Sequence, residues 1–316
     1  MRMTRRLFLG LAAVGLGLTP LGAAAAEFIN ILTGGQSGVY YPLGVALERL
    51  FAENIPDSSP SVQSTKASVE NLNLLQDGRG EIAFTLGDSL ALAWEGSEEA
   101  GFREKLDNLR TVAGIYPNYI QIVASKESGI AKLADLKGKR LSVGAPRSGT
   151  ELNARAILGA AGISYEDLGK VEYLPFAESV ELIKNRQLDA TLQSAGLGVA
   201  SIRDLASAVD IVVVEVPADI VAKVGSPYVE ATIPAGTYKG QDSDVKTAAV
   251  INYLVTRADL SDDLVYGMTK AIFENLDTLV AAHAAAKAIV LNQAAKNPPV
   301  PLHPGAERYF REKNVM

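Results

Sequence analysis

Short apolar runs of β type alternate with longer amphipathic segments along the whole chain after about residue 27. The first run, 28–32, leads through the glycine-rich turn 33–38 into a helical pattern. Two further units of the same kind place strands at 61–65 and 82–86. Because successive strand, turn and helix units build a parallel sheet covered by helices, this part of the chain predicts an α/β lobe.

A second set of units begins after a turn that we expect around Tyr116 and Pro117. Its strands are predicted at 119–124, 140–143, 171–174, 190–193 and 211–214. From about residue 232 the pattern changes to one more strand at 245–256, helices over 262–293 and a proline-rich tail. This second set predicts another α/β lobe, and the C-terminal stretch is expected to return to the first.

The fold predicted from this pattern is an α/β fold with two lobes. The first lobe is expected to contain 27–117 and 232–316, and the second 118–231. Each lobe should hold a parallel or mixed sheet flanked by helices, with a ligand cleft between the lobes. A hinge near 117–120 and 225–235 would close the cleft. This is the layout of a type II-like periplasmic binding protein.

Residues 1–26 have the pattern of a cleavable export signal. A basic start that contains Arg5 and Arg6 precedes an apolar run at 7–18 and an alanine-rich end. The apolar run is too short for a membrane-spanning helix, which needs roughly 20 residues. The run 4–9 also resembles a twin-arginine leader, and an ordinary Sec leader is the alternative. Either route predicts a periplasmic protein.

The composition limits the chemistry of the exported chain. There is no cysteine, which excludes disulfides, thiolate metal sites, a cysteine nucleophile and the lipid-bearing cysteine of a lipoprotein. We therefore expect a protein that is not lipid-anchored. Removing the leader, which holds three arginines and no acid, takes the formal net charge from −6 to −9. That negative charge argues against a nucleic-acid partner or an anionic membrane surface.

The sequence lacks the common catalytic motifs. The two histidines, His283 and His303, have no partner at metal-ligand spacing, and there is no HExxH motif. Neither a GxSxG elbow, a Walker phosphate loop nor a GxGxxG turn occurs. The sequence therefore predicts no enzyme, no bound metal and no cofactor.

Polar loops at the carboxyl ends of predicted strands are the candidate ligand site, because open α/β sheets bind ligands there. Several of these loops begin helices, whose free amides attract an anion. The alternative for each loop taken alone is a tight turn or a simple helix cap, with Ser68 and either Asp88 or Ser89 as caps. The candidate binding residues are Gly35, Gln36, Ser37, Tyr40, Tyr41, Thr65, Ser68, Val69, Asn71, Asp88, Arg147, Ser148, Gly149, Thr150, Gln193 and Ser194. We rank Tyr40, Ser68, Ser148 and Thr150 highest.

Four stretches that include these loops resemble one known family, the TAXI subgroup of solute receptors for tripartite ATP-independent periplasmic (TRAP) transporters. They are 33–44, 65–72, 144–150 and 301–306. The resemblance implies a monomeric two-lobed receptor for a small anionic solute, often glutamate, glutamine or a related dicarboxylate. Such a receptor delivers its solute to a permease driven by an ion gradient. A periplasmic sensory module that feeds a signalling kinase would use the same cleft and is the alternative.

One residue departs from the family pattern. The family's turn before Ser148, Gly149 and Thr150 is glycine-rich, whereas this chain has Arg147. A guanidinium that pointed into the cleft would bind a second carboxylate through two hydrogen bonds. One that pointed outward would be a surface charge. The sequence leaves both orientations open, and a tenfold loss of dicarboxylate affinity in Arg147→Ala would favour the inward one.

Overall fold

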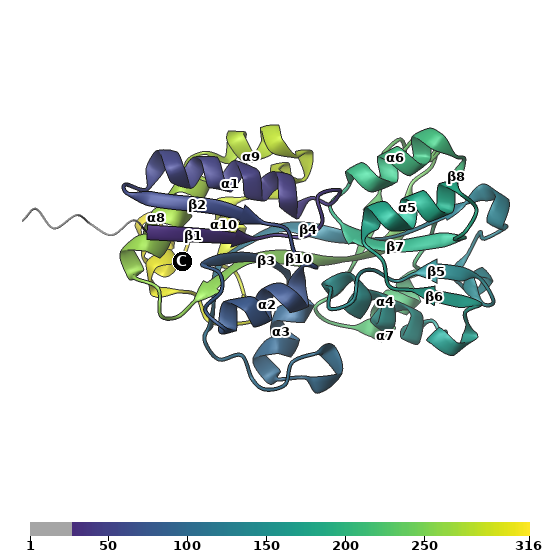
Figure 1. The fold of residues 1–316 in the computed structure, drawn as a ribbon, viewed down its shortest axis with the longest axis horizontal. Helices are drawn as coiled ribbons and strands as arrows, with labels where there is room; N and C mark the ends of the chain where they lie inside the picture. The colour runs from purple at the N-terminus through teal and green to yellow at the C-terminus, as the bar shows by residue number, and fades with distance from the viewer. Residues whose placement is uncertain (1–26) are drawn as a thin grey trace, which may run out of the picture.

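The computed structural model describes residues 27–316, so the export signal predicted at 1–26 lies outside the described residues. Two lobes lie side by side, joined by two long strands, β4 (Leu109–Ser125) and β10 (Val245–Arg257) (Figure 1). Within 27–316, no helix combines the length and the hydropathy needed to cross a membrane. The predicted two-lobed α/β fold is confirmed in this arrangement.

Three parallel strands begin the first lobe. β1 (Glu27–Leu32) lies between β2 (Ser58–Gln63) and β3 (Ile82–Leu86), in parallel register with both. The helices that follow these strands are α1 (Tyr40–Asn54), α2 (Ser68–Gln76) and α3 (Gly87–Glu95), with the short 3-10 helix η1 (Glu98–Ala100) behind them. The predicted parallel units are confirmed, although β2 begins three residues before the predicted strand 61–65. Each strand is followed by a helix that returns the chain to the same end of the sheet, and β3 is completely buried.

β4 (Leu109–Ser125) and β10 (Val245–Arg257) run antiparallel to one another through both lobes. Towards its start, β10 pairs with β9 (Val229–Ile233), and towards its end it pairs with β3. The two half-sheets are therefore one continuous ten-stranded sheet. Its main path has the order β2-β1-β3-β10-β4, followed by β7 (Ala190–Ala195), β5 (Arg140–Ser142) and β6 (Lys170–Glu172), and the other two strands are β9 beside β10 and β8 (Ile211–Val214) beside β4. The predicted lobe boundaries at 117/118 and 231/232 stay predictions, and this pairing favours a second boundary inside β10.

The turn expected around Tyr116 and Pro117 is wrong, because β4 continues through both residues. Pro117 lies opposite Ile251 of β10, and the register shifts between Ile251 and Tyr253. A proline has no N–H to donate, and an irregular point of the ladder accommodates it. β9 and the first half of β4 are strands that the sequence did not predict.

The second lobe continues the sheet from β4. β7 (Ala190–Ala195) pairs antiparallel with β4 and parallel with β5 (Arg140–Ser142), which in turn pairs with β6 (Lys170–Glu172). β8 (Ile211–Val214) also pairs with β4. The helices are α4 (Gly149–Ala160), α5 (Phe176–Lys184), α6 (Ala200–Ala208) and α7 (Ala218–Val224), with 3-10 helices η2 (Lys126–Ser128), η3 (Leu133–Leu136) and η4 (Tyr165–Asp167).

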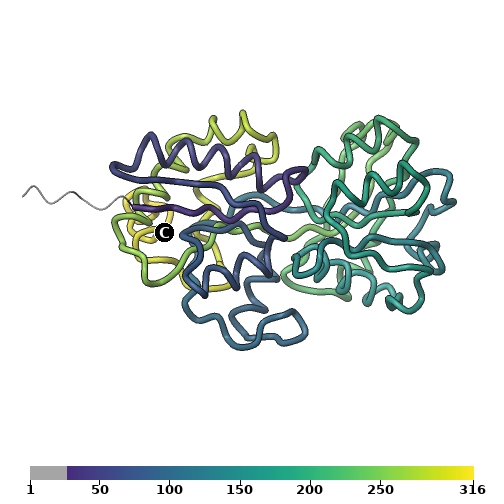
Figure 2. Tube along the Cα trace, in the orientation of Figure 1, coloured from purple at the N-terminus to yellow at the C-terminus, as the bar shows by residue number. Residues whose placement is uncertain are grey.

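The C-terminal segment returns to the first lobe, where the yellow end of the chain and the purple N-terminal segment belong to the same lobe (Figure 2). It forms α8 (Asp262–Phe273), α9 (Leu276–Ala282), η5 (Ala284–Ala288), α10 (Leu291–Ala294) and α11 (Pro304–Glu312). α11 is a helix in the predicted tail. His303 is buried at its N-cap, where Nδ1 accepts a hydrogen bond from Gly305 N at 3.1 Å. This histidine therefore has a structural role.

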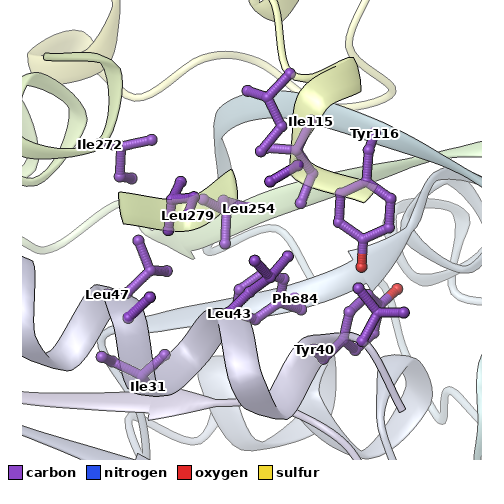
Figure 3. Close-up of a cluster of buried hydrophobic side chains, with 14 of the residues drawn as sticks. Ile31, Tyr40, Leu43, Leu47, Phe84, Ile115, Tyr116, Leu254, Ile272 and Leu279 are labelled. Atoms are coloured by element: carbon purple, nitrogen blue, oxygen red, sulfur yellow. The ribbon is translucent and has the colours of Figure 1, made fainter. Parts of the chain in front are cut away.

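A buried apolar cluster holds α1, α8 and α9 against the sheet (Figure 3). Its members Leu47, Leu254 and Ile272 are almost completely buried. At the inner end of the cluster, the Tyr40 ring stacks on Phe84 at 5.0 Å between ring centres, and the Tyr116 hydroxyl points towards Tyr40. The core thus ends in two tyrosines at the junction of the lobes.

Candidate ligand-binding cleft

A cavity of about 300 Å³ lies between the lobes. Five helices begin at it, α1, α2 and α3 from the first lobe and α4 and α5 from the second. Their N-cap residues all line the cavity, and they are Val39, Ala67, Leu86, Ser148 and Pro175. The first-turn amides of a helix have no carbonyl partner in their own helix, so five sets of donors converge on this space. The arrangement suits an anion.

Half of the predicted site residues line this cavity. They are Gly35, Tyr40, Thr65, Ser68, Ser148, Gly149, Thr150 and Ser194. The four residues that we ranked highest are all among them. The loops come from both lobes, as the cleft hypothesis requires, and their role in binding stays a prediction.

The serines at the starts of α2 and α4 differ in their contacts. Ser148 is the N-cap of α4, and its Oγ accepts a hydrogen bond from Glu151 N at 3.2 Å. Ser68 is not the cap of α2, because the helix begins at Ser68 itself and Ala67 is the N-cap. Instead, Ser68 Oγ accepts a hydrogen bond from Leu86 N at 3.1 Å. Both serines are nearly fully buried at the cavity.

α2 and α4 approach closely at their first residues. A Cβ atom added to Gly149 would lie 2.6 Å from Ser68 Oγ and 2.6 Å from Leu86 Cδ1. On the outer side, Glu70 N donates to Arg147 O at 3.2 Å. The N-termini of one helix from each lobe are therefore in direct contact at one edge of the cavity.

Ala67 has a strained backbone beside the cavity. Its φ is 69° and its ψ is −154°, a region that residues other than glycine rarely occupy. Thr65 Oγ1 accepts a hydrogen bond from Ala67 N at 2.9 Å and donates to Asn71 Oδ1 at 2.6 Å. These side chains hold the strained turn that directs the start of α2 at the cavity.

Three predicted site residues lie behind the cavity, in the core. Asn71 is fully buried, and its amide nitrogen donates to Thr33 O at 2.7 Å and Phe84 O at 2.8 Å. Val69 packs in an apolar cluster of the first lobe. The Gln193 side-chain oxygen accepts a hydrogen bond from Ser201 Oγ at 2.6 Å. Asn71 therefore links the segment after β1 to the middle of β3, and none of the three residues lines the cavity.

Four predicted residues lie towards the outside of the protein. Gln36 and Arg147 are exposed, Ser37 and Tyr41 are partly buried, and none of them lines the cavity. Of the two orientations left open for Arg147, its exposure favours the outward one. The tight turn at 35–38 is closed by a hydrogen bond from Gly38 N to Gly35 O at 3.0 Å, which agrees with the alternative of a strand-to-helix turn.

Asp88 lies beyond the cavity wall and connects the lobes. Its Oδ2 accepts hydrogen bonds from Asn153 Nδ2 and from the Tyr228 hydroxyl, both at 2.6 Å, and its Oδ1 accepts one from Ser89 N at 2.8 Å. Burial raises the pKa of the Asp88 carboxyl, and the hydrogen bond from Tyr228 opposes the rise. This cluster, which we call the Asp88 node, joins α3 of the first lobe to α4 of the second.

Several cavity residues escaped the sequence analysis. Tyr116 and Asn118 line the cavity from β4, and Phe176 lines it from the start of α5. Asn118 donates to Ser194 O at 2.9 Å and accepts from Asn252 Nδ2 at 2.8 Å. The sequence predicts a turn at Tyr116 and Pro117, whereas β4 continues through them. No local pattern identifies the residues of a long strand that line a cleft.

Charge is nearly absent from the cavity lining. Among residues 27–316, Lys66 is the one charged residue that lines it, and Lys66 is exposed at the mouth. No aspartate or glutamate of the described chain lines the cavity. In the same part of the chain, no group of three His, Asp or Glu side chains is placed to hold a metal ion. Hydroxyls, amides and aromatic rings form the remaining walls.

Several solved structures share this architecture. PhnD1 from Prochlorococcus marinus in complex with methylphosphonate has a TM-score of 0.58 at 13% identity, over 92% of this chain and 100% of that one. A putative L-cystine ABC transporter from Listeria monocytogenes has a TM-score of 0.51 at 15% identity, over 85% and 98%. The ligand-binding component of an ABC-type import system from Staphylococcus aureus has a TM-score of 0.51 at 12% identity, over 92% and 93%.

The fold is therefore the α/β periplasmic binding protein fold, with one mixed sheet flanked by helices and a cleft between two lobes. A family model described as the NMT1-like family matches residues 31–313, which is most of the chain. The protein belongs to the NMT1-like family.

Proposed function

We propose that this protein captures a small carboxylate outside the cytoplasm and delivers it to a membrane permease of the TRAP type. The observation that carries the proposal is the convergence of five helix N-termini, three from the first lobe and two from the second, on a cavity with no lining carboxylate among the described residues. Such a site favours an anion. The methylphosphonate in the PhnD1 complex is also a small anion.

Closure of the lobes is the step that a permease would recognise. Ser68 of the first lobe and Ser148 of the second both line the cavity, so a bound ligand can contact both lobes at once. A ligand that makes both sets of contacts only in the closed form shifts the population towards that form. The permease would then distinguish the unliganded receptor from the loaded one by the shape of the closed form.

A binding screen of the exported protein tests the carboxylate. We expect at least one member of a carboxylate panel, which includes glutamate, glutamine, dicarboxylates, oxo acids and simple monocarboxylates, to raise the melting temperature. Titration calorimetry should give saturable binding without turnover. A neutral or cationic ligand that stabilises the protein, with no effect from any member of the anionic panel, would sink the carboxylate proposal.

The permease class needs a separate experiment. The four stretches that resemble TAXI receptors support a TRAP permease, whereas the similar Listeria and Staphylococcus structures are of ABC-type systems. Uptake by vesicles that carry the permease should stop when the ion gradient is collapsed and continue without ATP. The opposite dependence would indicate an ABC importer. A protein that binds its ligand but activates a kinase, with no uptake, would be the sensory module.

Export can be tested through the leader. We propose a periplasmic location reached by the twin-arginine route, supported by Arg5 and Arg6 in the run 4–9. Replacing both arginines with lysine should leave the precursor in the cytoplasm. Normal export of that variant would indicate the Sec route.

A further inference from the structure

Two buried hydroxyls at the cavity have no hydrogen-bond partner within residues 27–316. Tyr116 is fully buried and Ser194 is 5% exposed, and both residues line the cavity. Neither the Tyr116 hydroxyl nor Ser194 Oγ makes a hydrogen bond within this part of the chain. A buried polar group without a partner costs free energy, so such groups at a ligand cavity indicate a partner that the ligand supplies.

The hydroxyls lie among uncharged groups at the floor of the cavity. The floor consists of Tyr40, Tyr116, Asn118 and Ser194, all of them buried, whereas Lys66 is at the exposed mouth. The amides of Asn118 and Asn252 are already occupied by one another and by backbone carbonyls. A second carboxylate on the floor would have no cation to pair with, and burying an unpaired charge is expensive.

A cationic group on the ligand is also disfavoured. The α-ammonium of an amino acid needs a carboxylate or several carbonyl acceptors when it is buried. No carboxylate of the described residues lines the cavity, and the five helix N-termini present donors rather than acceptors. These features select against zwitterions.

We propose, building on the receptor function above, that the ligand is a monocarboxylate without a cationic group. Its far end carries an uncharged hydrogen-bonding group, a hydroxyl, carbonyl or amide, that pairs with the hydroxyls of Tyr116 and Ser194. Its carboxylate lies at the helix N-termini and Lys66, and its apolar body packs on Tyr40 and Phe176. This specificity separates the ligand from dicarboxylates and amino acids.

A matched ligand series tests this specificity with the exported protein. Butyrate, γ-hydroxybutyrate, succinate and γ-aminobutyrate share one chain and differ only at the far end, and the same four end groups can be placed on chains of five and six carbons. Titration calorimetry should rank the hydroxy acid first at the best chain length. We expect it to bind about tenfold tighter than the dicarboxylate and the amino acid, because one buried hydrogen bond is worth that much.

Two variants test the assigned hydroxyls. Tyr116→Phe and Ser194→Ala remove groups that have no partner in the described chain, so the unliganded protein should keep its stability. Each should weaken the hydroxy acid by about tenfold and leave butyrate unchanged. Thr191→Val is the control, because Thr191 Oγ1 in the same strand as Ser194 is likewise buried and unpartnered within 27–316 but lies outside the cavity. It should change neither affinity.

The outcomes separate this inference from the proposed function. If the dicarboxylate or the amino acid binds at least as tightly as the hydroxy acid, or if both variants bind it like wild type, the inference is wrong and the carboxylate receptor stands. If no carboxylate of any series binds, the receptor function fails and the inference fails with it.

Discussion

Arg147 has a backbone conformation that glycine adopts more easily. Its φ is 61°, in the left-handed region, and its side chain is exposed outside the cavity. The family pattern that this chain resembles is glycine-rich at this turn. A positive φ explains that preference, because glycine adopts it without the steric cost of a Cβ atom. At the residue scale, Arg147 therefore contributes to this turn through its backbone conformation, and its side chain does not line the cavity.

We predict that Arg147→Gly raises the free energy of unfolding by roughly 0.5 to 1 kcal/mol, because glycine removes the strain of the positive φ. Chemical denaturation measures the change. Ligand affinity should stay within about twofold in both Arg147→Gly and Arg147→Ala, since one hydrogen bond would change it about tenfold. A tenfold loss of affinity in Arg147→Ala would instead indicate that the guanidinium contacts the ligand in the cleft.

At the scale of elements, Gly149 allows α2 and α4 to meet. The added Cβ of an alanine would approach Ser68 Oγ and Leu86 Cδ1 to 2.6 Å, closer than atoms pack. Gly149→Ala should therefore push the lobes apart and weaken ligand binding by about fivefold or more, because overpacking costs about 1 to 3 kcal/mol. Titration calorimetry measures the loss.

Gly159 gives the matched control in the same helix. A Cβ at this position meets nothing within 4 Å. Gly159→Ala should raise the free energy of unfolding by about 0.5 to 1 kcal/mol through helix propensity and leave affinity unchanged. Equal affinity of the Gly149→Ala and Gly159→Ala variants would mean that the contact between α2 and α4 does not affect binding.

Arg140 and Asp189 fasten β5 to the segment before β7. Arg140 Nη2 donates to Asp189 Oδ1 at 2.6 Å, and Arg140 Nε and N donate to Oδ2 at 3.1 and 2.8 Å. The hydrogen bond from the Arg140 guanidinium lowers the pKa of the Asp189 carboxyl below its ordinary value of 3.8. The pair therefore stabilises the fold above the unfolded pKa, and this stabilisation is lost as the pH falls through the folded pKa.

We predict that Asp189→Asn lowers the free energy of unfolding by about 1 kcal/mol at neutral pH, a modest value because solvent screens the partly exposed arginine. The difference from wild type should shrink as the pH falls below about 4. Denaturant melts across pH measure it. Asp219→Asn breaks an exposed pair with Lys223 and should show almost no difference at any pH. A pH-independent loss in Asp189→Asn would contradict the charge-based account.

At the scale of the whole molecule, the Asp88 node is a buried polar link between α3 and α4. It consists of Asp88, Asn153 and Tyr228, and all three are at least nine-tenths buried. A donor to a buried carboxylate contributes more than an ordinary hydrogen bond, about 1.5 to 3 kcal/mol. The node therefore favours the arrangement in which the lobes are together.

We predict that Tyr228→Phe, which removes one donor to Asp88, weakens ligand binding by about tenfold or more, because the closed form loses a hydrogen bond to a charged group. Calorimetry measures affinity, and small-angle scattering should record a larger unliganded protein. If the melting temperature falls while affinity and size stay unchanged, the node belongs to a fixed interface that does not open.

The local pattern of the chain determined most elements. Runs of β-branched residues placed β3, β8 and β10 within a residue of their observed bounds, and helical spacing with a polar start placed α2. Gly34, Gly35 and Ser148 marked loops that lie at the cavity, because strand ends and helix starts carry glycine and hydroxyl residues for local reasons. These signals are short-range, so the sequence by itself is sufficient for them.

Only the tertiary structure decided which polar side chains face the cleft. Asn71 and Ser68 lie on the same turn of α2, yet Asn71 binds backbone carbonyls in the core and Ser68 lines the cavity. Tyr116 reaches the cavity because β4 runs straight through Pro117 and pairs with β10, more than a hundred residues away. Such pairing depends on contacts between distant segments, and no local period of the sequence carries that information.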